Sequence, residues 1–312
     1  MTLKSFLLRF SRLLALVLLS MVVAVLNPNF LKISNLINIV RQASPQIIIS
    51  AGMTIVLLTG GIDLSIGSVV TLASIIAGYV LTQTKLHWSI AIVSALGSGL
   101  LCGLVSGILV AKVKLPSAIA TYGMLWVGRG LAFAIMGAFP YFGFPNAFRY
   151  IGRGILLGIP VPIWIMVAVA LVVYLFLKYT TLGKSIYAVG ANPYAAKASG
   201  LRVDRILIYT YMLSGLLAAL GGIILTARLN AVDQDIGAPF LLPAIASPVM
   251  GGTSMTGGRG GIGGTIIGTL IMTVLVNAMN LLRISSLWQQ FAIGLVVVLA
   301  VWLDMWIKKK TA

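Results

Sequence analysis

Long hydrophobic runs without a charged residue make up most of the chain, and three of the longest are 86–111, 154–177 and 260–282. A helix needs roughly 20 apolar residues to cross about 30 Å of hydrocarbon, so each run is long enough to span a bilayer. None of them shows the period-two alternation of a membrane-barrel strand. The pattern therefore predicts an all-α fold, a polytopic bundle of membrane helices.

About ten membrane segments fit this pattern. The predicted segments are 10–27, 45–60, 66–83, 88–111, 117–138, 162–178, 206–227, 241–256, 262–282 and 286–307. The second and the eighth are shorter than a full crossing, and a glycine-rich break follows each of them. We therefore expect short, broken helices at these two places within a single transmembrane domain, 1–312.

The two breaks resemble each other in sequence. Thr59-Gly60-Gly61 corresponds to Thr256-Gly257-Gly258, and the residues that follow the two triplets match at the same sequence separation. Unwound backbone is stable at membrane depth only where it lines a cavity or is buried in protein. Glycine-interrupted segments in corresponding halves of a chain therefore indicate the pathway of a transporter. Chance similarity between two glycine-rich stretches is the alternative.

The polar residues of the two breaks are the candidates for lining such a pathway. They are Thr59, Gly60, Gly61, Asp63 and Ser65 at the first break, and Thr253, Ser254 and Thr256 at the second. Asp63 has a second possible role, which we favour: as an N-cap, it would accept hydrogen bonds from free amides at the start of the next helix, for about 1 kcal/mol.

Composition supports a membrane protein, since 60% of the residues are hydrophobic and 9% are charged, against about 25% charged in soluble domains. The net charge of +17 would indicate nucleic acid in a soluble protein. Here basic residues at helix ends set the orientation and meet anionic lipid, so no nucleic-acid partner is expected. About twice as many basic residues fall on the side of the N-terminus, which predicts cytoplasmic N- and C-termini.

Two polar segments stand out from the hydrophobic background. Segment 178–205 carries six charged residues, and the orientation makes it a cytoplasmic loop. The other, 139–162, is an aromatic and proline-rich loop on the outer side that displays Arg149 and Arg153, and Asp233 and Asp235 add opposite charge on the same side. Arginine and aromatic side chains favour a docking surface, although a simple linker is the alternative. Arg129 lies inside the fifth segment, where it should face the bundle interior or snorkel outward.

The residues that catalysis or ion coupling needs are nearly absent. The chain has one Cys, one His and no Glu, which excludes a multi-thiolate metal site and argues against both a membrane enzyme and an ion-coupled secondary transporter. Gly183-Lys184-Ser185 resembles the end of a phosphate-binding loop, but the required earlier glycine is replaced by Lys178. We expect no catalytic site, no metal and no cofactor in this chain.

Several motifs in order resemble the permeases of ABC importers of the ribose and simple-sugar type, which are related to branched-chain amino-acid permeases. The stretches are GMTIVLLTGGIDLSIGS from Gly52, GILVAKVKLPSAIAT from Gly107, LGIPVPIWIM from Leu157, TTLGKSIYAVGANPYAAKASGL from Thr180 and IASPVMGGTSMTGGRGGIGGTIIGTLI from Ile245. The resemblance implies a permease subunit in the bacterial inner membrane that imports a monosaccharide such as ribose by alternating access. A branched-chain amino acid is the alternative substrate.

The resemblance also implies partners: a second permease subunit, identical or paralogous, two cytoplasmic ATPase subunits that hold ATP and Mg, and an external solute-binding protein. Residue by residue, it places an ATPase-coupling helix at Asn192, Tyr194, Ala195, Ala196, Gly200 and Leu201. Tyr194 stands where the family usually has Glu, so the resemblance leaves open whether the ATPase partner matches that of the ribose system.

Overall fold

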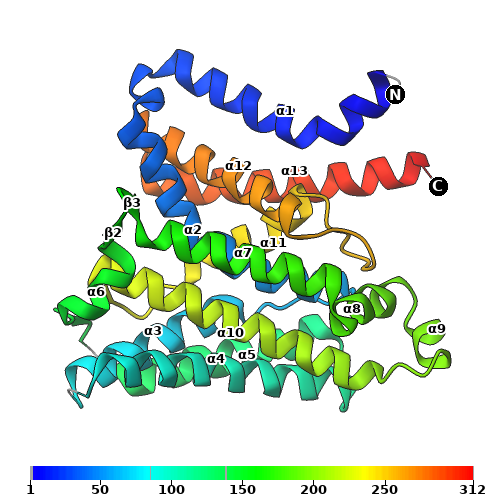
Figure 1. Cartoon of the computed structure of the whole chain (residues 1–312), viewed down its shortest axis with the longest axis horizontal. Helices are drawn as coiled ribbons and strands as arrows, with labels where there is room; N and C mark the ends of the chain where they lie inside the picture. Colours follow the sequence, from blue (N-terminus) through cyan, green and yellow to red (C-terminus); the bar gives the residue numbers. More distant parts are fainter. Residues whose placement is uncertain (1–2, 85, 138, 312) are drawn as a thin grey trace.

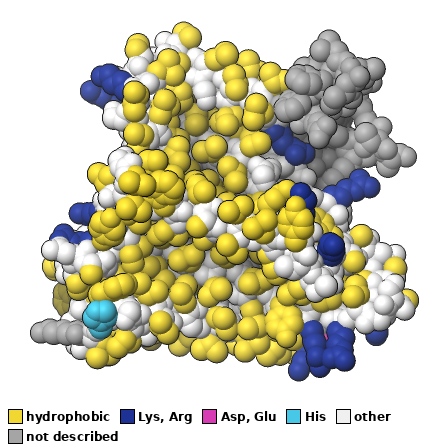
Figure 2. Space-filling model, viewed as in Figure 1, with side chains coloured by type: hydrophobic (Ala, Val, Ile, Leu, Met, Phe, Trp, Pro, Cys, Tyr) yellow, Lys and Arg dark blue, Asp and Glu magenta, His cyan; other side chains and the backbone are white. Residues whose placement is uncertain are grey.

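The computed structural model describes residues 3–84, 86–137 and 139–311, with side chains described for all of these except 3–11, 286, 300, 301 and 303–311. Helices account for nearly all of this structure and pack into one bundle (Figure 1). Most of the face shown in Figure 2 is hydrophobic, and its basic side chains gather toward the edges. A hydrophobic surface of this extent fits a lipid-embedded bundle.

The elements follow the predicted segments closely. The helices are α1 (Leu3–Leu26), α2 (Ile33–Leu58), α3 (Ile66–Thr82), α4 (Trp88–Ala111), α5 (Ser117–Met136), α6 (Asn146–Arg153), α7 (Val161–Tyr179), α8 (Thr181–Ala191), α9 (Pro193–Ala198), α10 (Val203–Leu229), α11 (Leu241–Met250), α12 (Ile262–Leu281) and α13 (Ser286–Thr311), with 3-10 turns at Pro28–Leu31 and Ala238–Phe240. Five of them, α4, α5, α7, α10 and α12, are long and apolar enough to cross a membrane by length and composition.

Within the described residues, four two-residue strands lie at the end of the bundle opposite α8 and α9. The strand β1 (Tyr141–Phe142) pairs antiparallel with β4 (Ala231–Val232), and β2 (Ile155–Leu156) pairs with β3 (Ile159–Pro160). The first pair ties the connection after α5 to the connection after α10. The second folds back the short stretch between α6 and α7.

The expected short second segment is wrong, because α2 starts at Ile33 and runs for 26 residues. Its first turns looked like a loop because they are polar and precede Pro45. In the structure these polar side chains find partners: Asn35 donates to Asn277 at 3.2 Å, and Arg41 donates to Asn38 at 3.0 Å. The eighth segment is short as expected, since α11 has 10 residues.

The helices α4 and α10 cross at very short range. A Cβ built on Gly215 would lie 2.1 Å from the carbonyl oxygen of Gly99, so two backbones meet where only hydrogen atoms fit between them. Small residues permit this approach between membrane helices. Beside this crossing lies α3, which is buried along almost its whole length.

Both α3 and α11 occupy only part of the bundle's depth. Asp63, just before α3, bonds Ser214, which lies eleven residues into α10 and hence about 16 Å from its first residue. The start of α11 is next to the same place, because a Cβ on Gly67 would lie 3.3 Å from the Cβ of Leu241. The two helices therefore begin near one level in the interior and run toward opposite ends.

The ends of the bundle are distinguished by what they carry. The first residues of α1 and the last residues of α13 lie at the same end as α8 and α9, on the right of Figure 1. The opposite end carries α6 and the four strands. This matches the predicted grouping of both termini with segment 178–205.

Candidate functional site

The helix α9 is the short exposed helix that the sequence places in the ATPase-coupling segment. The side chain of Asn192 accepts hydrogen bonds from the backbone N–H groups of Tyr194 and Ala195, both at 3.0 Å. This is N-cap geometry, and Pro193 takes the first helical position, where no N–H is needed. Tyr194 stands 87% exposed at the tip of the segment.

The other end of α9 is closed by glycine. Gly200 has φ +84, and the N–H of Leu201 reaches back to the carbonyl of Ala196 at 3.1 Å. A left-handed residue followed by this bond is the common glycine stop of a helix. Ala196 is buried in a hydrophobic cluster with Ile186 and Leu201 against it. The predicted coupling residues therefore form one compact, doubly capped unit that is held to the bundle by Ala196.

The end of α8 meets both helix breaks at one place, which we call the inner junction and define as Leu58, Gly60, Gly190, Gly257 and Gly258. The N–H of Gly258 donates to the carbonyl of Leu58 at 2.9 Å. A Cβ built on Gly190 would lie 1.8 Å from that carbonyl oxygen and 2.7 Å from the amide nitrogen of Gly258. The two breaks that match in sequence therefore lie side by side, with α8 against both.

Three hydroxyls of the breaks, those of Thr59, Ser254 and Thr256, bond within their own segments. Thr59 donates to the carbonyl of Val56 at 2.7 Å, and the hydroxyls of Ser254 and Thr256 lie 2.8 Å apart. Thr253 is fully buried. The structure thus gathers six of the predicted pathway residues around the inner junction, and their lining of a path stays a prediction. Those six are Thr59, Gly60, Gly61, Thr253, Ser254 and Thr256.

Asp63 has a different role from the expected N-cap. Its Oδ1 accepts from the backbone N–H of Ser65 at 3.0 Å and from the Ser65 hydroxyl at 2.6 Å, and its Oδ2 accepts from the Ser214 hydroxyl at 2.8 Å. Ser65 is the N-cap residue of α3, and its side chain makes no capping bond. The carboxylate therefore fixes the turn before α3 and joins it to α10. Ser214 is 151 residues away, and sequence reasoning missed it.

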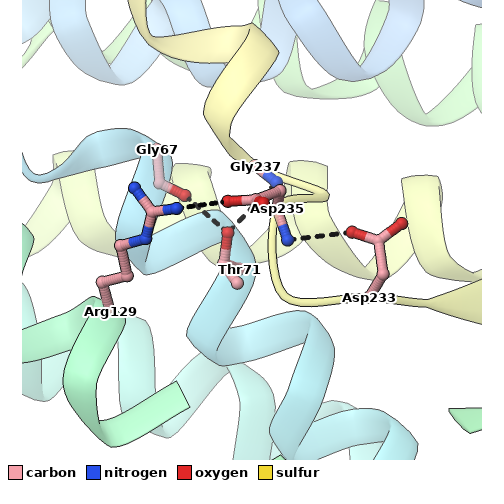
Figure 3. Close-up of polar contacts among 6 residues, drawn as sticks. All are labelled: Gly67, Thr71, Arg129, Asp233, Asp235 and Gly237. Atoms are coloured by element: carbon pink, nitrogen blue, oxygen red, sulfur yellow. Dashed lines mark hydrogen bonds and ion pairs between the residues drawn. The ribbon is translucent and has the colours of Figure 1, made fainter. Parts of the chain in front are cut away.

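On the outer side, Arg129 of α5 pairs with Asp235 at 2.6 Å (Figure 3). Its guanidinium also lies 5.8 Å from the ring centroid of Trp126 and 5.3 Å from that of Phe133. Asp233 accepts the backbone N–H of Asp235 at 2.9 Å and so shapes the loop that presents the carboxylate. Asp235, predicted as a docking residue, is thus the partner that the sequence left unidentified for Arg129.

The two arginines predicted to dock a binding protein differ in what they touch. Arg153 donates to the carbonyls of Arg228 and Leu229, at 2.7 and 3.0 Å, and so caps the end of α10. Arg149 bonds Asn146 within its own helix α6. Arg153 therefore has a structural task beside any docking role, and docking by these residues stays a prediction.

Comparison with known proteins decides the family. The model of the family described as branched-chain amino acid transport system / permease component matches residues 35–301. The chain belongs to this permease family. The match runs from the first turn of α2 into the second half of α13, so it covers the inner junction, α9 and the Arg129–Asp235 pair together.

Individual relatives of this permease match over more than three quarters of their length. The ribose import permease protein RbsC of Haemophilus influenzae is 42% identical over 95% of this chain and 93% of its own, and that of Bacillus subtilis is 41% identical over 96% and 92%. The fructose import permease protein FrcC of Rhizobium meliloti is 34% identical over 88% of this chain and 78% of its own. No solved structure matches the chain.

Proposed function

We propose that the chain is the membrane-spanning subunit of an ATP-driven ABC importer, and that it moves ribose or a related small sugar into the cytoplasm by alternating access. The observation that carries the transport mechanism is the inner junction, where the coupling segment touches both helix breaks. Identity above 40% to ribose import permeases from two bacteria favours the sugar over the amino acid in the family description.

The junction explains how movement of a partner ATPase would reach the path. α9 offers an exposed, doubly capped surface, and α8 connects it to Gly190. The contacts of Gly190 are to the Leu58 oxygen and the Gly258 nitrogen, both backbone atoms. Backbone in close contact has no rotamer to absorb a displacement, so a shift of α8 moves both breaks. Their neighbours α2, α11 and α12 then move relative to the rest of the bundle.

The remaining parts of the assembly follow from this mechanism as proposals. The path lies between this subunit and a second permease subunit, which is a second copy or a paralogue. A cytoplasmic ATPase pair binds α9, and ATP and Mg belong to that pair. A solute-binding protein docks at the opposite end, over α6 and the loop with Asp233. Both termini face the cytoplasm of a bacterium, and the ten predicted segments lie in the inner membrane, with α3 and α11 crossing only part of its depth.

ATP hydrolysis by the assembled complex tests the proposal. The chain is reconstituted in lipid with the ATPase and the binding protein encoded beside it, and hydrolysis is measured across a panel of sugars and leucine. We expect ribose or a close relative to stimulate hydrolysis through the loaded binding protein. Stimulation by leucine and by no sugar would show that the substrate is a branched-chain amino acid. No stimulation by any sugar, with a binding protein shown to hold that sugar, would contradict the proposal.

A further inference from the structure

A small cavity with a mostly apolar lining and a few polar side chains lies among α3, α5 and the loop before α11, away from the inner junction. Its volume is about 120 Å³, which is enough for several waters. The polar side chains that line it are Ser68, Thr71, Arg129, Gln234 and Asp235. A wider hollow of about 410 Å³ adjoins it toward the outside and shares Gln234 and Asp235 with it. We call the smaller space the outer cavity.

The outer cavity has a rigid wall. The hydroxyl of Thr71 accepts the N–H of Gly237 at 3.1 Å and donates to the carbonyl of Gly67 at 3.2 Å (Figure 3). A Cβ built on Gly237 would lie 2.1 Å from the Gly67 oxygen, so the loop rests directly on the first turn of α3. These backbone contacts of Gly237 therefore fix the main-chain position of Asp235, which lies two residues earlier.

The depth of the ion pair makes a lipid-facing role costly. Arg129 lies seven residues before the end of α5, hence about 10 Å below it along the helix. Its side chain is 36% exposed and that of Asp235 is 64% exposed. Charged side chains at membrane depth face water or protein and mark solute pathways. The pair therefore points to a wet space rather than to lipid.

The hydrogen-bonding capacity left in this space is mixed. The bond between the pair uses one Nη of Arg129 and Oδ1 of Asp235, which leaves further N–H donors on the guanidinium and Oδ2 as an acceptor. Gln234 donates to the carbonyl of Gly137 at 2.7 Å, so its Oε1 can accept. A sugar hydroxyl both donates and accepts, and it can use these groups without separating the pair.

We propose that the outer cavity is where the permease contacts its solute, and that Arg129, Gln234 and Asp235 bind a neutral polyhydroxylated molecule. A zwitterionic amino acid would need the 2.6 Å pair to part before its own charges could be bound. The cavity is small for a sugar, so the solute enters when the walls separate during transport. This inference rests on the proposed sugar import and adds the place where the permease recognises the solute.

The ratio between two transported sugars tests the site. Asp235→Asn keeps the size of the side chain but weakens charge-assisted hydrogen bonds. In reconstituted complex with saturating, sugar-loaded binding protein, we expect it to change the ratio of the two uptake rates by about threefold or more. Asp204→Asn is the matched control, because Asp204 also pairs with a cation at 2.6 Å, Lys114, at the other end of the bundle. We expect the control to leave the ratio unchanged.

A purely structural role for Asp235 would slow both sugars equally, and that result would overturn the proposal. The wild-type complex in the same experiment tests sugar import separately, so failure of the site is distinct from failure of the proposed function. A change of ratio in Asp204→Asn as large as that in Asp235→Asn would also overturn it, because the effect would then not be local.

Thiol labelling gives a second measurement that does not depend on the binding protein. With the single cysteine Cys102 replaced by alanine, Gln234→Cys is treated from outside with a membrane-impermeant thiol reagent. We expect free ribose to slow this labelling severalfold and leucine to leave it unchanged. Phe142→Cys, at a position 71% exposed on the same side, should be labelled without protection. Absence of protection by ribose at any soluble concentration, or equal protection by leucine, would overturn the assignment.

Discussion

At the inner junction, Leu58, Gly190 and Gly258 meet through backbone atoms, whereas at the outer cavity Arg129 and Asp235 meet through charged side chains. The first contact has no side chain between its parts and no room for one. The second is formed by flexible side chains that are partly open to water. In the proposed mechanism this difference gives the two regions different roles. The rigid junction passes a movement of α8 on to both helix breaks, and the flexible side chains of the cavity bind and release a solute.

The segment 59–65 connects these two regions. It begins at the junction beside Leu58 and ends at the first turn of α3, where Gly67 lines the outer cavity. Asp63 anchors its middle to Ser214 of α10. In the proposed mechanism, displacement at the junction reaches the cavity through this short stretch, which Asp63 bonds to α10.

The largest effect is expected from one methyl group at the junction. Gly190→Ala places a Cβ 1.8 Å from the Leu58 oxygen, and overpacking of this kind costs about 3 kcal/mol or more because backbone must move. We expect sugar uptake in proteoliposomes to fall about tenfold or more for every sugar transported. Gly263→Ala is the control, because nothing lies within 4 Å of a Cβ there. Normal uptake by Gly190→Ala would contradict the claim that the inner junction is too tightly packed to accept a side chain, and so would remove its contrast with the outer cavity.

The next effect concerns the anchor between the two regions. Asp63→Ala leaves the Ser65 N–H and the Ser214 hydroxyl, both buried, without their acceptor. The expected loss is about 2 kcal/mol of stability or more, since each of the two buried unsatisfied groups costs about 1–3 kcal/mol. Thermal unfolding in detergent measures it. Asp63→Asn retains an acceptor and a donor in the same volume, so it should lose clearly less, and equal losses would argue against the anchoring role.

Removing the cap of α9 should act more weakly and at the cytoplasmic end alone. Asn192→Ala frees two backbone N–H groups, and loss of an N-cap costs about 0.5–2 kcal/mol. We expect a severalfold weaker association with the ATPase, measured by titrating the ATPase onto the reconstituted permease, with the ratio between two sugars unchanged. A shift in that sugar ratio would show that the two regions are not separable. Asn192→Asp, which keeps the acceptor, should associate normally.

The smallest expected effect is at Tyr187, whose hydroxyl donates to the carbonyl of Gly260 at 3.0 Å beside the junction. Tyr187→Phe should cost about 0.5–1.5 kcal/mol of stability. Burial raises the pKa of the Tyr187 phenol above its usual value of 10.0. The donated bond is therefore present at neutral pH and is lost only as pH rises through that raised pKa. The stability difference from wild type should stay constant between about pH 6 and 8, and a change within that range would contradict this.

Much of the fold could be predicted because its signals are local. Hydrophobic runs located the membrane helices, and the resemblance to the permease family placed a short helix between Asn192 and Leu201. The start of α2 could not be placed this way. Asn35 is satisfied by Asn277, 242 residues away, and a local reading treats such a residue as part of a loop.

The candidate sites were harder to predict, because they too depend on contacts between residues far apart in the sequence. The sequence named Asp63, Arg129 and Asp235 as costly charges, but the partner of each lies far along the chain. One signal was available: an arginine inside a membrane segment needs a carboxylate, and Asp233 and Asp235 were the acids expected on the same side. The similarity of the two breaks in sequence indicated that they belong to one site. That α8 packs against both of them depends on tertiary structure and could not be predicted.

Sugar uptake by proteoliposomes, driven either by ATP or by an ion gradient, tests the proposed import most directly. With ATP and Mg on the ATPase side and loaded binding protein on the other, labelled ribose or a related sugar should accumulate. The permease without its ATPase should accumulate none under a proton or sodium gradient. Accumulation by the permease alone under an ion gradient would contradict ATP-driven import through the α9 surface and the inner junction.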